Sequence, residues 1–263
     1  MTQPNPVLMV TLNNQHLTRL AVRTVHWQTL NPSPYLFVID NGSTDNTPAW
    51  LHQRGIDHSA YPATLRQSLS HVWNVGLNYL FSLGAQHVLV VNNDILLPPN
   101  LYGDLLSDPA GFVTGVGDSS ESLKQSLLDR TAHAASNRRP HPDFSCFLIR
   151  KWVWDAIGPF DENFKGAFCE DLDYHLRMNA VGIEAVSAGV PFWHYASATI
   201  KSADPQFRNE ILRNAEANRA YFLRKWKVPV PTPENGGVEY YRLFGQSSPE
   251  SSPSEQPREG LPD

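Results

Sequence analysis

Polar side chains gather at three points in the first 95 residues, each directly after an apolar segment. The three groups are Thr11 with Asn13, Asp40, and the run Asn92-Asn93-Asp94. In an open parallel sheet, ligands bind beyond the carboxyl ends of the strands, so three such ends indicate one crevice for a polar ligand. Ordinary turn residues after strands are the alternative interpretation.

Well-known nucleotide and metal motifs do not account for these groups. The chain has no Gly-x-Gly-x-x-Gly and no Walker lysine loop, and it lacks His-Glu-x-x-His and Gly-x-Ser-x-Gly. The run 40–45 superficially resembles a calcium loop. Its glycine, Gly42, stands third instead of sixth, and Leu51 occupies the twelfth position, where that loop needs a glutamate.

The elements around the polar groups follow from the apolar pattern. Strands are expected at 7–12, 35–39 and 87–91, and helices at 16–30 and 64–83. Strands that alternate with helices predict a parallel sheet flanked by helices.

The second half of the chain is less regular. Expected strands are 112–116, 144–149, 183–187 and 192–195, and expected helices are 150–157, 170–180 and 205–227. Residues 117–142 have weak periodicity and are expected to form a mobile loop. The tail 246–263 is rich in Ser and Pro and is expected to be disordered.

Composition narrows the class of protein. The 263 residues are 41% hydrophobic, which is enough for a sizeable core, and the formal charge of −5 gives no global sign of a nucleic-acid binder. Two cysteines, Cys146 and Cys169, exclude a disulfide framework. The N-terminus lacks the apolar segment of a signal peptide, and no run approaches a membrane span. We expect a cytoplasmic protein, either free or peripheral at a membrane.

Several segments, in this order, resemble family 2 glycosyltransferases of the GT-A fold. They are 7–13, 37–45 (FVIDNGSTD), 74–77 (NVGL), 90–94 (VVNND), 146–150 (CFLIR), 158–162 (GPFDE), 170–173 (EDLD) and 192–194 (FWH). Asn-Asn-Asp followed by Gly-x-Phe-Asp-Glu resembles the rhamnosyltransferase-like subset.

The resemblance implies an α/β fold of GT-A type, with a Rossmann-like, mostly parallel sheet flanked by helices. It implies one domain over 1–245, with a nucleotide-binding half at 1–100 and a mixed acceptor half at 101–245. The implied activity is transfer of a sugar, with inversion, from a nucleotide diphosphate sugar to an acceptor hydroxyl. UDP or dTDP is favoured as the nucleotide, because a carboxylate suits the ring N–H of uracil or thymine.

The resemblance also assigns nucleotide-sugar contacts. Asp40 would accept a hydrogen bond from the base, in a pocket lined by Thr11 and Asn13. The remaining contacts are Asn74, Asn92, Asn93 and Asp94. The alternative for Asp40 is that it only caps the turn formed by 41–44.

A divalent cation would neutralise the leaving diphosphate. By resemblance its protein ligands are Asp94 and His194, and Mn²⁺ or Mg²⁺ suits these donors better than Zn²⁺. The family often has an acid where this chain has Asn92, so cation binding should be weak without the diphosphate. A purely structural histidine is the alternative for His194.

Asp171 is the candidate general base for the acceptor hydroxyl. Glu170 and His175 are acceptor-side candidates, whereas Asp173 should point elsewhere on the helix. The alternative is an acidic first turn that satisfies the helix dipole, with Arg177 as a surface partner.

The acceptor is left open between a glycan, a lipid-linked glycan and a modified nucleobase. The basic residues of the helix 205–227 could face phosphate, although a solvated helix face is the simpler interpretation. Two rival functions are a non-catalytic sugar-nucleotide binding protein, admitted by Asn92, and a glycosyltransferase that acts on modified DNA bases. The net charge counts against the second.

Overall fold

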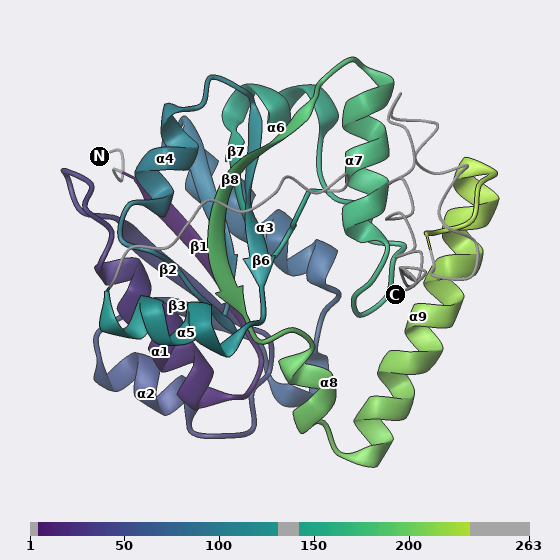
Figure 1. Cartoon of the computed structure of the whole chain (residues 1–263). Coiled ribbons are helices and arrows are strands. Elements are labelled where there is room, and N and C mark those ends of the chain that lie inside the picture. The colour runs from purple at the N-terminus through teal and green to yellow at the C-terminus, as the bar shows by residue number, and fades with distance from the viewer. Residues whose placement is uncertain (1–4, 131–141, 232–263) are drawn as a thin grey trace, which may run out of the picture.

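A computed structural model describes residues 5–130 and 142–231, which contain one eight-stranded sheet (Figure 1). Its strands are β1 (Pro6–Thr11), β2 (Tyr35–Asp40), β3 (Asp57–Ala60), β4 (His87–Asn92), β5 (Ile95–Leu96), β6 (Phe112–Asp118), β7 (Cys146–Arg150) and β8 (Ala185–His194). Their spatial order is β3-β2-β1-β4-β7-β6-β8-β5. The first four strands in that order run parallel, as the alternation of strands and helices in the sequence predicts.

The other half of the sheet is mixed. Strand β7 lies antiparallel between β4 and β6, β6 pairs parallel with β8, and the short β5 pairs antiparallel with β8. The expectation of a mostly parallel sheet with a mixed second half is therefore confirmed.

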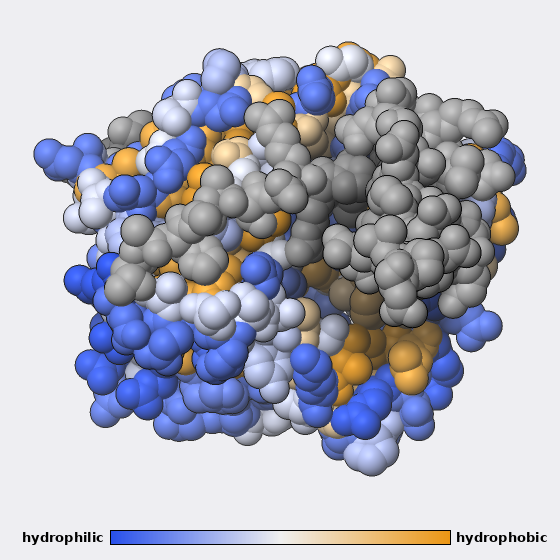
Figure 2. Space-filling view, viewed as in Figure 1, coloured by the Kyte–Doolittle hydropathy of each residue, from blue (hydrophilic) through white to orange (hydrophobic). Residues whose placement is uncertain are grey.

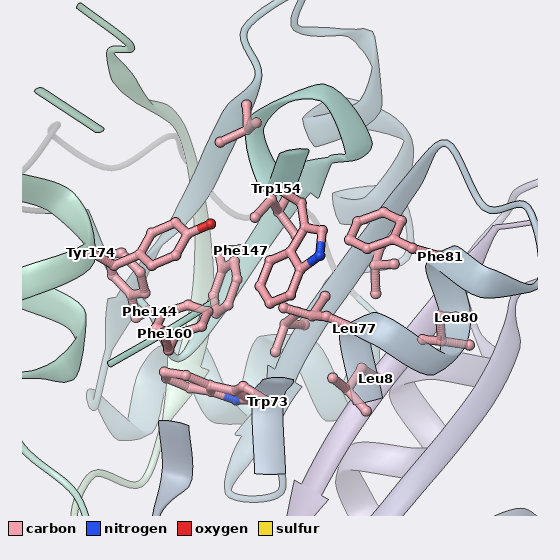
Figure 3. Close-up of a cluster of buried hydrophobic side chains, with 14 of the residues drawn as sticks. Leu8, Trp73, Leu77, Leu80, Phe81, Phe144, Phe147, Trp154, Phe160 and Tyr174 are labelled. Carbon is pink, nitrogen blue, oxygen red and sulfur yellow. The ribbon is translucent and has the colours of Figure 1, made fainter. Parts of the chain in front are cut away.

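Helices cover both faces of this sheet. The helices of the described residues are α1 (Gln15–His26), α2 (Thr47–Gln53), α3 (Leu69–Ser82), α4 (Leu101–Ser107), α5 (Glu121–Asp129), α6 (Lys151–Ile157), α7 (Glu170–Ala180), α8 (Ala198–Ser202) and α9 (Pro205–Trp226), with a 3-10 turn at Ala63–Leu65. One hydrophobic cluster packs α1, α2 and α4 against the sheet. A second packs α3, α6 and α7 against the other face, where the ring of Trp73 contacts those of Phe147 and Phe160, and Phe160 stacks on Tyr174 (Figure 3).

Close packing of α3 on the sheet depends on Gly76. A methyl group at this position would overlap the side chain of Leu8 on β1 and crowd Ile39 on β2. The glycine of the Asn-x-Gly segment therefore has a packing role, because it lets α3 lie close to β1 and β2.

Three expectations for single elements are wrong. Residues 117–142 were expected to form a loop, but β6 continues to Asp118 and α5 spans Glu121–Asp129, burying Leu123 and Leu127; 131–141 lie outside the described residues. The strands expected at 183–187 and 192–195 are one strand, β8. The helix expected at 64–83 begins only at Leu69, after the 3-10 turn.

Two expectations concern the ends of the chain and the membrane. The tail 246–263 lies outside the described residues, so its disorder stays a prediction. Within 5–130 and 142–231, no helix is both long and apolar enough to cross a lipid bilayer.

Candidate functional site

A cavity of about 670 Å³ opens at the carboxyl ends of β1 and β4. Its walls come from the ends of β1 and β4, Asn41 after β2, the segments 66–71, 162–168 and 194–200, and the first half of α9. The polar wall holds Thr11, Asn92, Asn93, Asp94 and His194, so most of the predicted polar groups do meet in one crevice. Figure 2 shows hydrophobic surface beside α9 and next to α8.

Asp94 and His194 are brought together by the pairing of β5 with β8. That pairing sets Ile95 opposite His194, and the His194 Nε2 lies 3.4 Å from the Asp94 Oδ1. The other ring nitrogen, Nδ1, lies 3.2 Å from the hydroxyl of Ser145, which fixes the plane of the imidazole. A carboxylate and an imidazole at this separation form a donor set suited to a divalent cation.

The protein offers few further ligands for such a cation. Within the described residues, no group of three His, Cys, Asp or Glu side chains converges on one point. Asp94 is already partly engaged, since its Oδ2 accepts from the backbone N–H of Ala198 at 3.4 Å. The Asp94–His194 pair therefore fits a cation that receives its remaining ligands from a bound molecule or from water.

Asn93 fastens the end of β4 to the end of β1. Its side-chain amide donates to the hydroxyls of Thr11 and Thr18, both at 3.0 Å, and to the backbone oxygen of Asn13 at 3.3 Å. Thr11 and Thr18 are themselves hydrogen-bonded at 2.9 Å. This buried network holds the polar wall in place, and nothing in the sequence pattern identified Thr18 as part of it.

Asp40 and Asn13 organise the turn that follows β2. Asp40 Oδ1 accepts from the backbone N–H groups of Gly42 and Ser43, and Asn13 Oδ1 accepts from that of Thr44. Burial raises the pKa of Asp40, and these backbone hydrogen bonds partly offset the rise. The second oxygen of Asp40 is buried and makes no hydrogen bond to the described residues. Neither Asp40 nor Asn13 lines this cavity, but Asn41 does.

Asn74 is also absent from the residues that line the cavity. Its amide donates to the backbone oxygen of Phe160 and its oxygen accepts from the backbone N–H of the same residue, at 2.9 and 2.8 Å. The amide also donates to Glu162 at 2.9 Å. Asn74 thus anchors the Gly-Pro-Phe-Asp-Glu segment to α3.

The acidic start of α7 lies next to the cavity without lining it. Glu170, Asp171 and His175 are not among the lining residues, whereas Phe168, three positions before Asp171, is. Asp171 is partly buried, and its Oδ1 accepts from the backbone N–H of Leu172. Burial, together with the neighbouring Asp171, raises the pKa of the fully buried Glu170 well above its usual range.

Arg177 pairs with Asp173, not with Asp171. The Arg177 Nε lies 3.0 Å from the Asp173 Oδ2, and the Asp173 side chain is fully buried. Lys225 and Trp226 of α9 donate to the other oxygen of Asp173, at 2.6 and 2.8 Å. Asp173 therefore points away from Asp171, as expected, but it is a structural core residue.

Several cavity residues were not among the predicted site residues. Arg66, His71, Glu162 and Lys165 line the cavity, and α9 adds Phe207. The Arg66 guanidinium lies 4.4 Å from the centre of the Phe207 ring. His71 was detectable in principle, because it stands three positions before Asn74 on one face of a helix.

Comparisons with known proteins agree with this architecture. No family model matches the chain. A curated relative, a galactofuranosyl glycosyltransferase of Leishmania donovani, is 22% identical over 252 residues, 74% of this chain; the chain spans 57% of that relative's length.

Solved structures give the fold. A mannosyltransferase from Pyrobaculum calidifontis, in complex with GDP-Man and Mn²⁺, matches 93% of this chain, and 69% of its own length is covered, with a TM-score of 0.59 and 16% identity. GalNAc-T7 with UDP, GalNAc and Mn²⁺ matches 94% of this chain and 56% of its own length, with a TM-score of 0.56 and 12% identity. TarS 1-349 of S. aureus matches 93% of this chain and 81% of its own length, with a TM-score of 0.50 and 15% identity. The chain has the GT-A fold of nucleotide-sugar glycosyltransferases.

Proposed function

We propose that this chain is a metal-dependent glycosyltransferase that moves a sugar from a nucleotide diphosphate sugar to an acceptor hydroxyl. The observation that carries the proposal is the Asp94–His194 pair, placed on the wall of a large cavity at the carboxyl edge of a GT-A sheet. The relatives support it, since the mannosyltransferase and GalNAc-T7 were solved with Mn²⁺.

Asp94 and His194 would hold Mn²⁺ or Mg²⁺. When bound, such a cation neutralises charge that develops on a leaving diphosphate. Ser145 keeps the His194 ring oriented, and Asn93 keeps the end of β4 against β1. Asn92, in place of an acid, limits the protein's own charge at this point. We therefore expect metal and nucleotide to bind cooperatively.

The nucleoside would lie toward the ends of β1 and β2. One oxygen of Asp40 is buried and has no hydrogen-bond partner within 5–130 and 142–231. This supports a ring N–H donor, as in uracil or thymine, because an unsatisfied buried acceptor is costly until it is paired. Thr11 and Asn13 border the same region. UDP or dTDP is therefore the nucleotide that we propose, with a small turn movement giving the base access to Asp40.

Asp171 would take the proton of the acceptor hydroxyl. The hydroxyl oxygen attacks the anomeric carbon as the bond from that carbon to the diphosphate breaks. An attack from the face opposite the leaving group inverts the configuration. The acceptors that we propose are a glycan or a lipid-linked glycan, with the protein in the cytoplasm or peripheral at a membrane. We also propose that the chain belongs to the rhamnosyltransferase-like subset.

Calorimetry tests the proposal. UDP should bind more tightly in Mn²⁺ than in EDTA, and Asp94→Ala should abolish that difference while the fold stays intact. Asp129→Ala, which removes an exposed carboxylate of α5, is the matched control and should keep the full difference. Equal affinity in EDTA and in Mn²⁺ for UDP, dTDP and GDP would contradict the proposed role of Asp94 and His194.

One observation favours a second candidate, a sugar-nucleotide binding protein without turnover. None of Glu170, Asp171 and His175 lines the cavity. Release of nucleoside diphosphate from a sugar nucleotide in Mn²⁺ separates the two functions. Binding without any release, over a panel of sugars and simple glycoside acceptors, would favour the second.

A further inference from the structure

A histidine–glutamate pair lies on another wall of the cavity. His71, in the first turn of α3, and Glu162, in the segment before α7, both line it. The His71 Nδ1 lies 3.0 Å from the Glu162 Oε2. Both side chains are partly exposed, at 32% and 49%, so a bound molecule can reach them.

Glu162 is held in a fixed orientation from the other side. Its Oε1 accepts from the amide of Asn74, which is buried and is itself bonded through both of its polar atoms to the backbone of Phe160. The chain of contacts thus runs from a buried backbone through Asn74 and Glu162 to His71. Such a chain fixes the rotamer of an imidazole at a cavity wall.

The hydrogen bonds also fix the tautomer of His71. Hydrogen bonds from Asn74 and His71 lower the pKa of Glu162, so this side chain is a carboxylate that only accepts. The proton of a neutral imidazole must then be on Nδ1, which leaves a lone pair on Nε2. This Nε2 makes no hydrogen bond to any residue in the described part of the chain.

We propose that His71 is a specificity-determining residue whose Nε2 accepts a hydrogen bond from a hydroxyl of the transferred sugar, and that Glu162 is its positioning residue. This inference rests on the proposed function. A hydroxyl suits the site because it is a neutral donor, whereas a phosphate would meet a lone pair beside the Glu162 carboxylate.

The position of the pair agrees with a sugar contact. The diphosphate is assigned to Asp94 and His194, so the attached sugar must extend into the remainder of the same cavity. Glu162 belongs to the segment that leads into α7, where the candidate base Asp171 lies. The backbone N–H of Leu69 also donates to the oxygen of Gly166, which holds the start of α3 against that segment.

The test compares a nucleoside diphosphate with its sugar nucleotide, using UDP with UDP-GalNAc and GDP with GDP-mannose in Mn²⁺. For His71→Ala we expect the Kd of the sugar nucleotide to rise about fivefold or more, as for the loss of one hydrogen bond. The Kd of the nucleoside diphosphate should change by less than about twofold. His52→Ala, at an exposed histidine of α2, is the matched control and should leave both unchanged.

Glu162→Ala tests the positioning role without removing the imidazole. It removes the acceptor of the His71 Nδ1–H, so this hydrogen bond no longer holds the ring in its orientation. We expect the same selective loss of sugar-nucleotide affinity, with the fold intact. Wild-type affinity in Glu162→Ala would overturn this role.

Two results would overturn the role of His71. One is an equal loss for sugar nucleotide and nucleoside diphosphate in His71→Ala, and the other is no loss for either ligand. Failure of the proposed function is distinguishable, because it appears in the unmodified chain as the absence of nucleoside diphosphate binding; that result would overturn this proposal as well.

Discussion

Glu170 and Asp171 are adjacent carboxylates in different surroundings. Glu170 is buried at the start of α7, and one of its oxygens makes no hydrogen bond to the described residues. Asp171 is only partly buried. Burial penalises the charged form of Glu170 and Asp171 adds a like charge, so the pKa of Glu170 lies well above its usual range. Asp171, in the more exposed of the two positions, is the candidate base.

Asp171→Asn should lower turnover with little effect on donor binding. The substitution keeps the shape and removes the charge that would accept the hydroxyl proton, so we expect a loss of about a hundred- to ten-thousandfold in kcat. The Kd of the sugar nucleotide should change by less than about threefold. Steady-state kinetics with the best donor, alongside calorimetry, make the measurement.

The control for this prediction must come from another helix. Asp173→Asn looks neutral in the sequence, but Asp173 is fully buried and bonded to Arg177, Lys225 and Trp226. Glu121→Gln, in the exposed first turn of α5, is the suitable control and should keep full transfer. Near-wild-type transfer by Asp171→Asn would remove Asp171 from the mechanism.

Glu170→Gln should stabilise the fold at neutral pH. The pKa of Glu170 is raised in the folded protein, so the fold favours the protonated side chain. Its contribution to stability is therefore fully present below the unfolded pKa, about 4.3, and is lost as pH rises through the folded pKa. Glutamine removes that dependence. Urea unfolding should show a gain at pH 7.5 that disappears near pH 4, and a constant difference across this range would contradict the assignment.

At the scale of elements, the segment before α7 is held in a strained conformation by α9. Phe168 and Cys169 have φ values of 82° and 73°, which non-glycine residues rarely adopt. The buried side chain of Asn218 makes four hydrogen bonds to this segment: it accepts from the N–H of Lys165 and donates to the oxygens of Lys165, Ala167 and Phe168. These bonds stabilise the strained backbone and keep Phe168, 38% exposed, on the cavity wall.

Asn218→Ala should therefore destabilise the protein by about 2–4 kcal/mol, since it leaves buried donors and acceptors unpaired. Urea unfolding measures the loss. Asn209→Ala, at an exposed position of the same helix, is the control and should stay within about 0.5 kcal/mol of wild type. Equal stability of the two variants would show that the segment holds its shape without α9.

The sequence predicts elements better than it predicts contacts between them. Strands β1, β2 and β4 are continuous apolar runs, so their position and parallel pairing follow from pattern alone. Helix α5 was missed because only Leu123 and Leu127 mark its buried face. Asp94 lies next to His194 because of a strand pair that joins residues about 100 positions apart. Spacing in the sequence could not predict this proximity, and only the family resemblance named the two residues together.

Helix α9 is joined to the rest of the protein by a cluster of charges. The Lys225 ammonium lies 2.7 Å from Asp161 and 2.6 Å from Asp173, and Tyr221 also donates to Asp161. Asp161 belongs to the segment before α7, and Asp173 to α7 itself. Since the first half of α9 forms one wall of the cavity, this cluster at its other end sets the position of that wall.

Acid should weaken this junction. Burial alone would raise the pKa of Asp161, but hydrogen bonds from Lys225, Asn163 and Tyr221 hold it well below its usual range. A lowered folded pKa gives stability that is present above the unfolded value, about 3.9, and is lost as pH falls below it. The same contacts outweigh the effect of burial on Lys225 and raise its pKa, so its contribution is present below about 10.4 and is lost at higher pH.

Lys225→Met should remove most of this dependence. The substitution leaves Asp161 and the fully buried Asp173 without their shared cation, so we expect the free energy of unfolding to fall by about 2–3 kcal/mol at pH 7. This is less than for a fully buried pair, because the Lys225 side chain is 27% exposed. The loss should shrink as pH falls from 5 to 2, because the unfolded state of wild type takes up protons in this range and the pairing then contributes less to its stability. Lys151→Met, which breaks an exposed pair with Asp155, should cost less than about 1 kcal/mol at every pH. Urea unfolding of wild type and the two variants between pH 2 and 7 makes the comparison. If the free energy of unfolding of wild type and Lys225→Met varied with pH in parallel, α9 would be held by its apolar contacts alone.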